Sequence, residues 1–332
     1  MRQSAVRAGE VLIEGGDGCV TAEGTDWSAE VDGYARRLAV ADGRLYVATD
    51  TGRIYCFGPG EPAGGIPPTI RRSVEATDAE PGPLAREVLA LLAERQRDLG
   101  YALVLGDPEA DLARALASAT EMHVLQVLES EESARAARER LLETTHLYGS
   151  RIAVTHLPED GGLPFPPYFA NIIVGGPETL GVAAEDVHRV LRPAGGLWLP
   201  GPGWTPPDEL ELQPVDHADS TLGFVLKRGK LAGAFDWDSE VPADERLRWP
   251  LSLSWFGRPG PGRMANRHSH GPIPIAANGR YFHVGYHHII AVDAYNGTEL
   301  WCRHVPWAVH QRTRGDIPSL ESLSADDESV YL

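Results

Sequence analysis

The sequence predicts two kinds of sheet in one chain: a doubly wound α/β domain set between two all-β segments. Three observations lead to this fold class. Hairpin-like repeats with period-two apolar patterning occur before residue 58 and again after residue 275. Apolar strand patterns alternate with amphipathic helix patterns in the middle of the chain. A proline- and glycine-rich stretch separates the first two parts, so we expect segments at 1–58, 59–82, 83–231 and 232–332.

The first clear hairpin lies within residues 38–58. Asp42-Gly43 is a dipeptide typical of a tight two-residue turn. Apolar and polar residues alternate in Leu45–Ala48 after it, and Ile54–Phe57 follows a second turn. These features predict antiparallel strands with one buried face.

A second copy of this pattern occupies residues 276–301. Asn278-Gly279 replaces the first turn, and Tyr281–Val284 and Ile289–Val292 replace the strands. Partial copies occur at 11–27 and at 323–332. Such hairpins cannot bury both of their faces alone, which predicts a repeat architecture.

The segment Ala291–Trp301 reads Ala-x-Asp-x-x-x-Gly-x-x-x-Trp and resembles the repeats of PQQ-like (pyrroloquinoline-quinone-like) β-propellers. The resemblance implies four-stranded blades and a propeller face that binds a protein or a small ligand. A propeller needs at least about four blades. This chain supplies two or three, so we expect the remaining blades to lie outside it. PQQ itself is not expected, since no calcium-ligand cluster with adjacent cysteines is present.

The middle of the chain predicts a parallel sheet covered by helices. Pro83 is typical of a helix start, and further helices are expected at 112–119, 133–144 and 186–191. Five apolar runs have the length of buried parallel strands: Tyr101–Leu105, His123–Leu128, Ile152–Val154, Asn171–Val174 and Leu197–Leu199. Leu222–Arg228 is expected to close the sheet as an edge strand.

Three segments of this region resemble class I S-adenosylmethionine-dependent methyltransferases: Leu103–Gly106, Pro164–Ile173 and Val187–Gly196, whose Arg-Val-Leu-Arg-Pro-x-Gly-Gly pattern is the most specific. The complete expectation is therefore a Rossmann-like, methyltransferase-type domain inserted into a partial PQQ-like β-propeller.

The resemblance implies that S-adenosylmethionine contacts the loops at the carboxyl ends of the strands. The candidates for cofactor binding are Gly106, Asp107, Glu129 and Asp160. The first loop departs from the family's Gly-x-Gly-x-Gly pattern, because Pro108 and Ala110 replace two glycines. Proline fixes φ and removes a donor, so the loop favours a domain that has lost its chemistry.

We therefore expect a binding or assembly platform with a degenerate methyltransferase-like insert. Two alternatives remain open: an active methyltransferase with an atypical glycine loop, and a fragment of a quinone-dependent oxidoreductase. No catalytic residue is assigned.

Composition excludes other classes of function. The formal net charge of −17 disfavours nucleic acid as a partner, and no apolar run is long enough to span a membrane. Three scattered cysteines match no metal-ligand spacing, and the histidines gathered after residue 267 do not indicate a metal site either. We expect export if the full-length protein carries a signal peptide, and a cytoplasmic protein otherwise.

Overall fold

A computed structural model describes residues 4–59, 80–217, 223–234, 236, 249, 253–257, 274–285, 287–306, 323–326 and 328–331. The chain divides into two compact units, Met1–Arg71 and Arg72–Leu332. None of the described helices is long and apolar enough to cross a membrane.

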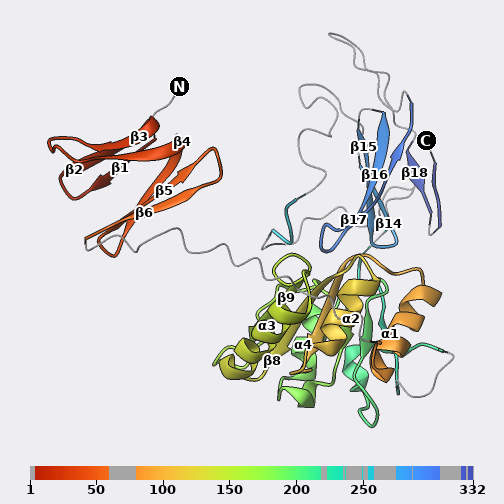
Figure 1. The fold of residues 1–332 in the computed structure, drawn as a ribbon. Helices are drawn as coiled ribbons and strands as arrows, with labels where there is room; N and C mark the ends of the chain where they lie inside the picture. The colour runs from red at the N-terminus through yellow and green to blue at the C-terminus, as the bar shows by residue number, and fades with distance from the viewer. Residues whose placement is uncertain are drawn as a thin grey trace. The chain divides into compact units, whose positions relative to one another are not determined.

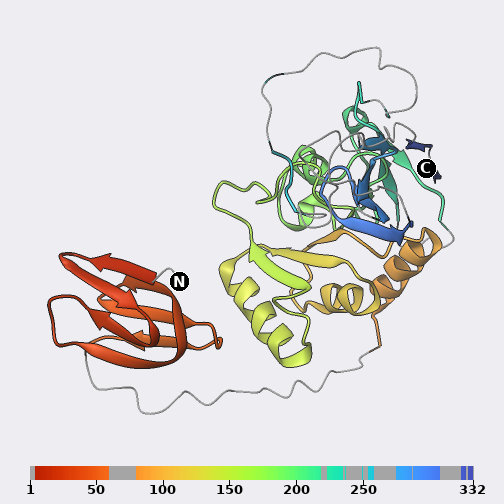
Figure 2. The same cartoon turned by 90° about the horizontal axis from the view of Figure 1, so that it is seen from above.

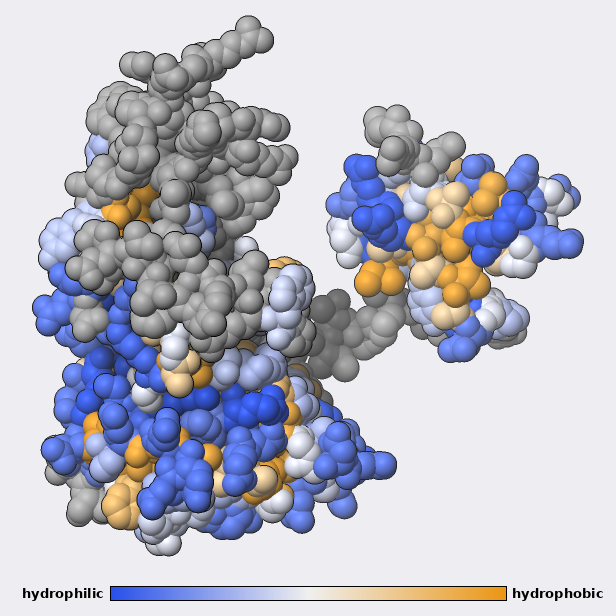
Figure 3. Space-filling view, turned by 180° about the vertical axis from the view of Figure 1, so that it is seen from behind, coloured by the Kyte–Doolittle hydropathy of each residue, from blue (hydrophilic) through white to orange (hydrophobic). Residues whose placement is uncertain are grey.

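The N-terminal unit is an open, curled sheet of six antiparallel strands in chain order (Figure 1). The strands are β1 (Ser4–Ala8), β2 (Val11–Gly15), β3 (Asp17–Ala22), β4 (Ser28–Ala41), β5 (Arg44–Thr49) and β6 (Ile54–Phe57). The long β4 pairs with β3 through its first half and with β5 through its second half. Val20, Ala35 and Val47 are fully buried inside the curl. Apolar residues also gather at the middle of this unit's surface, between hydrophilic residues (Figure 3).

The predicted turn at Asp42-Gly43 is confirmed. Both residues have positive φ, 49° and 69°, as a type I′ hairpin turn requires. Asn278 and Gly279 have nearly the same angles, 48° and 69°. The two hairpins that the sequence pattern equates therefore share one turn geometry.

The second unit contains a seven-stranded mixed sheet in the order β12-β13-β11-β10-β7-β8-β9. Its strands are β7 (Tyr101–Leu105), β8 (His123–Leu128), β9 (Ile152–His156), β10 (Ile172–Val174), β11 (Leu197–Leu199), β12 (Leu212–Pro214) and β13 (Leu226–Arg228). The first five are parallel. The expected neighbours Tyr101–Leu105 and Val124–Leu128 are adjacent parallel strands.

The predicted edge strand needs correction. β13 is not at the edge, because β12 pairs antiparallel with its outer side. β12, a three-residue strand that ends in Pro214, was not predicted from the sequence. A proline is tolerated in a strand at a sheet edge, where its missing N–H breaks no ladder bond.

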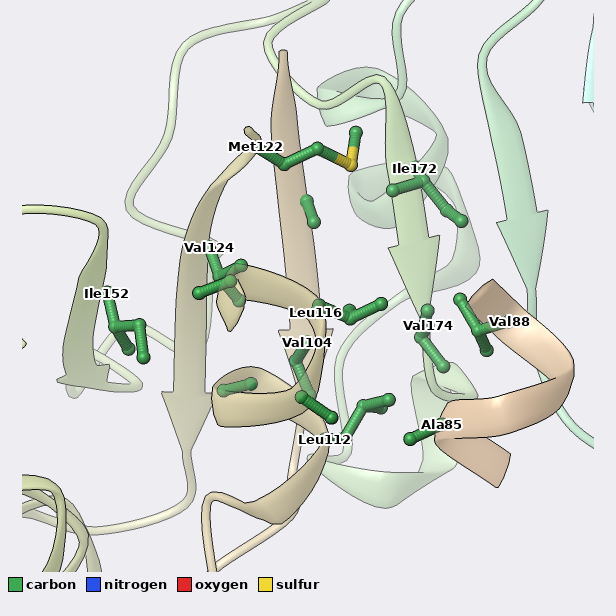
Figure 4. Close-up of a cluster of buried hydrophobic side chains, with 14 of the residues drawn as sticks. Ala85, Val88, Val104, Leu112, Leu116, Met122, Val124, Ile152, Ile172 and Val174 are labelled. Atoms are coloured by element: carbon green, nitrogen blue, oxygen red, sulfur yellow. The ribbon is translucent and has the colours of Figure 1, made fainter. Parts of the chain in front are cut away.

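Helices cover both faces of this sheet, as Figure 2 shows from above. They are α1 (Pro83–Glu94), α2 (Asp111–Ala119), α3 (Glu131–Thr144) and α4 (Ala184–Val190), with short 3-10 turns η1 (Pro177–Thr179) and η2 (Asp208–Leu210). Side chains of α1, α2 and α3 form one core with alternate strand residues. In Figure 4, Leu116 of α2 lies against Val104, and Val88 of α1 lies beside Val174. Helix α4 packs on the other face with Leu103, Ile173 and Trp198. Both faces of the parallel strands are thus buried, which explains their unbroken apolar runs.

A four-stranded antiparallel sheet follows in the same unit, with strands β14 (Ile275–Ala277), β15 (Arg280–Gly285), β16 (His288–Asp293) and β17 (Glu299–His304). A separate pair comprises β18 (Ser324–Ala325) and β19 (Val330–Tyr331). Four strands is the size of one propeller blade. Nothing in the described residues, however, shows a ring of blades, and the N-terminal sheet has six strands.

The four-stranded sheet is joined to the α/β domain by a buried polar network. Asp293 is 1% exposed and accepts hydrogen bonds from Arg192 Nε at 2.5 Å and Asn171 Nδ2 at 3.0 Å. Arg192 also donates to the Gly279 carbonyl at 2.9 Å. Asn296 Nδ2 donates to Asn171 Oδ1 at 2.8 Å. The aspartate of the repeat motif therefore binds the arginine of the Arg-Pro-x-Gly-Gly motif.

Candidate functional site

The parallel sheet has its switch point between β7 and β10. From β7 the chain proceeds outward to β8 and β9, and from β10 it proceeds the other way to β11. Ligands of open α/β sheets bind beyond the carboxyl ends of the strands at this point. The loops concerned are residues 106–110 after β7 and 175–179 after β10.

The loop after β7 has three residues in the left-handed region, although only one of them is a glycine. Gly106, Asp107 and Ala110 have φ values of 86°, 62° and 57°. The left-handed region is costly for a residue with a Cβ, so Asp107 and Ala110 must be held there by other contacts. Gly106 is needed at its position, because a Cβ would lie 2.7 Å from Thr179 Cγ2. The loops after β7 and β10 are thus in close contact.

Asp107 provides one of these contacts by capping α2. Its Oδ2 accepts the backbone N–H groups of Leu112 at 2.9 Å and Ala113 at 3.4 Å. Burial raises the pKa of Asp107 to about 6, more than these hydrogen bonds lower it. A helix N-terminus is ordinarily a site for a ligand's anion. Here the chain's own carboxyl group occupies it.

Gln126 binds the loop after β7 through its side-chain amide. This residue of β8 has no solvent exposure, and its Nε2 donates to the Gly106 carbonyl at 2.9 Å and also to the Asp107 carbonyl. Its Oε1 is buried and has no partner among the described residues. Gln126 was not among the residues predicted from the sequence. The available signal was a single amide side chain inside an otherwise apolar strand.

The other two predicted site residues lie on neighbouring loops. Glu129 is exposed and directly follows β8, while the preceding Leu128 is 2% exposed and packs in the core. Asp160 is exposed in the loop after β9, where its Oδ1 accepts the Gly162 N–H at 3.2 Å. Asp107, Glu129 and Asp160 therefore follow three adjacent strands at one edge of the sheet. In the described part of the chain, no hydrogen bond or ion pair joins them to one another.

No cluster of histidine, cysteine or acidic side chains suited to a metal occurs among the described residues. Three late histidines, His268, His270 and His310, lie outside that part of the chain. All three cysteines are free thiols.

Comparison with known proteins gives fold likenesses only. No family model matches the chain, and no curated protein matches it. A protein from Methanococcus maripaludis, provisionally assigned as an S-adenosyl-L-methionine-dependent methyltransferase, is 13% identical over 45% of this chain and 85% of its own, with a TM-score of 0.35. A SAM-dependent methyltransferase from Aquifex aeolicus is 12% identical over 45% and 91%, with a TM-score of 0.33. The [4+2]-cyclase SpnF is 21% identical over 34% and 43%, with a TM-score of 0.29.

These TM-scores are low, so the assignment of the domain depends on its own topology. Leu103–Gly106 forms the end of β7 and the start of the switch-point loop, and Arg192–Gly196 forms the turn into β11. Two of the three segments that carry the sequence resemblance thus lie at the switch-point loop and at the turn into β11. The second unit contains a doubly wound, Rossmann-type α/β domain.

Proposed function

We propose that the α/β domain binds S-adenosylmethionine at the carboxyl edge of its parallel sheet. The observation that carries the proposal is the capping of α2 by Asp107. A pyrophosphate needs free N–H groups at such a helix N-terminus. With that position filled by a carboxyl group, the edge disfavours phosphate-bearing dinucleotides and favours a nucleoside with positive charge.

S-adenosylmethionine has this charge pattern, with a sulfonium and an ammonium against one carboxylate. The acidic groups at this edge of the sheet fit part of the S-adenosylmethionine molecule. Glu129 and Asp160 are exposed carboxylates that would accept hydrogen bonds from ribose hydroxyls or the adenine amine. Asp107 suits a neighbouring cation. The methionine carboxylate does not fit the α2 N-terminus, so we derive no methyl-transfer step and assign no catalytic residue.

Calorimetric titration of the whole chain tests the proposal. We expect S-adenosylmethionine to bind more tightly than S-adenosylhomocysteine, which lacks the sulfonium charge, and NAD not to bind. Glu129→Gln removes the charge and replaces one acceptor oxygen with an NH₂ group. It should weaken binding by roughly tenfold or more, because hydrogen bonds to charged groups contribute about 1.5–3 kcal/mol. Glu132→Gln is the matched control, since Glu132 is exposed in the first turn of α3. Binding of NAD, or equal affinity of Glu129→Gln and the unaltered chain, would contradict the proposed role.

A second candidate function is a scaffold without cofactor. It is favoured by the loop after β7, where Asp107 accepts two N–H groups of α2 and Gln126 donates to two loop carbonyls without any ligand. It is also favoured by the end of β8, where Leu128 is buried and the acidic candidate Glu129 follows only after the strand has ended. Absence of S-adenosylmethionine binding would support this candidate. The propeller-borne platform, its missing blades and the quinone-dependent alternative stay predictions.

A further inference from the structure

A cavity of about 640 Å³ lies at the opposite, amino-terminal edge of the parallel sheet. One wall comes from the connection between α1 and β7 and from the first residues of β10 and β11. The other wall comes from the four-stranded sheet, including Arg280, Leu300 and Trp301. β7 has five residues, so about 16 Å of strand separates this cavity from the carboxyl edge.

The cavity has an excess of positive charge. Four arginines line it, against two aspartates: Arg95, Arg97, Arg192 and Arg280, with Asp98 and Asp293. Arg192 and Asp293 neutralise each other in their buried ion pair, with side chains 7% and 2% exposed. Asp98 is exposed. The chain as a whole has a net charge of −17, so a positively charged concave site attracts anions selectively.

Two of these arginines, Arg97 and Arg95, have guanidinium N–H groups available for a ligand. Arg97 Nη1 donates to the Gly195 carbonyl, and no carboxylate pairs with Arg97 in the described part of the chain. Arg95 Nη2 donates to the Asp216 carbonyl at 2.8 Å and lies 3.9 Å from Glu94, a carboxylate 54% exposed. Arg95 Nε is buried without a partner among the described residues. Burial and the neighbouring Arg192 and Arg95 lower the pKa of Arg97. A bound anion would relieve this crowding of like charges.

Apolar side chains complete the lining. Met122 is 1% exposed and Leu92 is 2% exposed, and Leu99, Leu300 and the aromatic ring of Trp301 are partly buried. The lining of the cavity therefore combines charged groups with apolar side chains. Its volume lies within the usual range of about 300–1,000 Å³ for small-molecule pockets.

We propose that this cavity binds a small organic anion, a carboxylate or phosphate monoester with an apolar body, through Arg95 and Arg97. The guanidinium fork matches the two oxygens of either group. The apolar part of the ligand lies against Leu300 and Trp301. This site is separate from the proposed nucleoside site, and either can fail without the other.

The test uses the whole chain and four probes at low ionic strength: phenyl phosphate, benzoate, inorganic phosphate and benzyl alcohol. Binding is followed by calorimetry and by the ¹⁵N-resolved Nε–Hε signals of the arginines. We expect phenyl phosphate or benzoate to bind with a roughly millimolar or lower Kd. Inorganic phosphate should bind about tenfold more weakly, and benzyl alcohol should not bind. Which aromatic anion binds more tightly distinguishes a phosphate from a carboxylate ligand.

Arg97→Gln and Arg95→Gln should each weaken the tighter aromatic anion at least tenfold and leave S-adenosylmethionine binding unchanged. Arg86→Gln is the matched control, because Arg86 is an exposed arginine of α1, the helix that ends just before Arg95. Circular dichroism checks that each variant is folded. If Arg97→Gln does not fold, Arg95→Gln alone tests the proposal. The proposal is overturned if no aromatic anion binds the unaltered chain, if benzyl alcohol binds equally well, or if a folded Arg95→Gln variant keeps full affinity.

Discussion

Asp293→Asn should be among the most damaging single substitutions in the second unit. The change keeps the size of the side chain but removes its charge. Asp293 is 1% exposed and has three donors within 3.0 Å: Arg192 Nε, Asn171 Nδ2 and the Tyr295 N–H. After the substitution, Arg192 becomes an unpaired cation that is only 7% exposed.

The magnitude follows from this burial. Breaking a buried ion pair by removing one partner costs about 3–5 kcal/mol, because the remaining charge stays desolvated. The amide would still accept one hydrogen bond, but its NH₂ group would face the guanidinium. Arg97, which interacts electrostatically with both Arg192 and Asp293, adds like-charge repulsion to the same place. We therefore expect a loss of about 3–5 kcal/mol in the free energy of unfolding of this unit.

Urea unfolding followed by hydrogen exchange measures the loss and locates it. Protection should fall first in β16 and in the turn Arg192–Gly196, which are the two sides of the network. Asp111→Asn is the control, since the Asp111–Arg114 pair is exposed on the aspartate side, at 68%, and should contribute less than about 1 kcal/mol. If Asp293→Asn costs no more than this control, the network does not hold the two sheets together.

Further predictions concern a turn and two titrating groups. Gly279→Ala should lower the free energy of unfolding by about 1–3 kcal/mol more than Gly43→Ala does. Both glycines have a φ of 69°, but only at Gly279 would a Cβ lie 2.7 Å from Arg192 Nη2. Equal losses in the two unfolding transitions would rule out an effect of this contact. The folded-state pKa of Asp107, about 6, lies above the ordinary 3.8, so the folded state binds more protons and stability falls as pH rises from about 4 to 6, by at most about 3 kcal/mol. Asp107→Asn should abolish this fall, and an unchanged slope of urea midpoint against pH would contradict the assignment. Burial, and then Arg228, lower the pKa of His188 from 6.5 to about 4, so stability should rise over about the same pH range, and His188→Gln should remove that rise.

Local sequence patterns were sufficient for most of the elements. Period-two alternation placed Leu45–Ala48 and Tyr281–Val284 in antiparallel strands, and apolar runs placed the five parallel strands. These features are local, since the period of the apolar residues follows from the face that each element buries. The start of α2 was predicted one residue late, at Leu112 rather than Asp111. Strand β12 is too short and too polar to have a period at all.

The site was less predictable because its contacts join distant residues. Asp107 was identified as acidic and close to α2, but its capping role depends on the left-handed φ of Asp107 and Ala110. Neither residue is a glycine, so the sequence did not indicate this conformation. Gln126 reaches the loop from 20 residues away. Asn171 and Asp293 are separated by 122 positions. Gln126 stands out in the sequence as an amide inside an apolar strand, but the partner residue has no sequence signal in either link, because side-chain hydrogen bonds between separate elements leave no periodicity.

The network around Asp293 changes how the two sequence motifs are interpreted. Asp293 belongs to the repeat motif and Arg192 to the methyltransferase-like motif, and each was first considered in its own context. In the structure the two motifs neutralise each other's buried charge. Asn171, at the start of β10, receives one hydrogen bond from each side of the junction, from the Tyr101 N–H and from Asn296 Nδ2. Once the two elements are packed together, removing either charged side chain would leave the other buried without a partner. The arginine-lined cavity is formed by residues of both the α/β domain and the sheet that follows it, so the ion pair that joins the two also shapes the cavity.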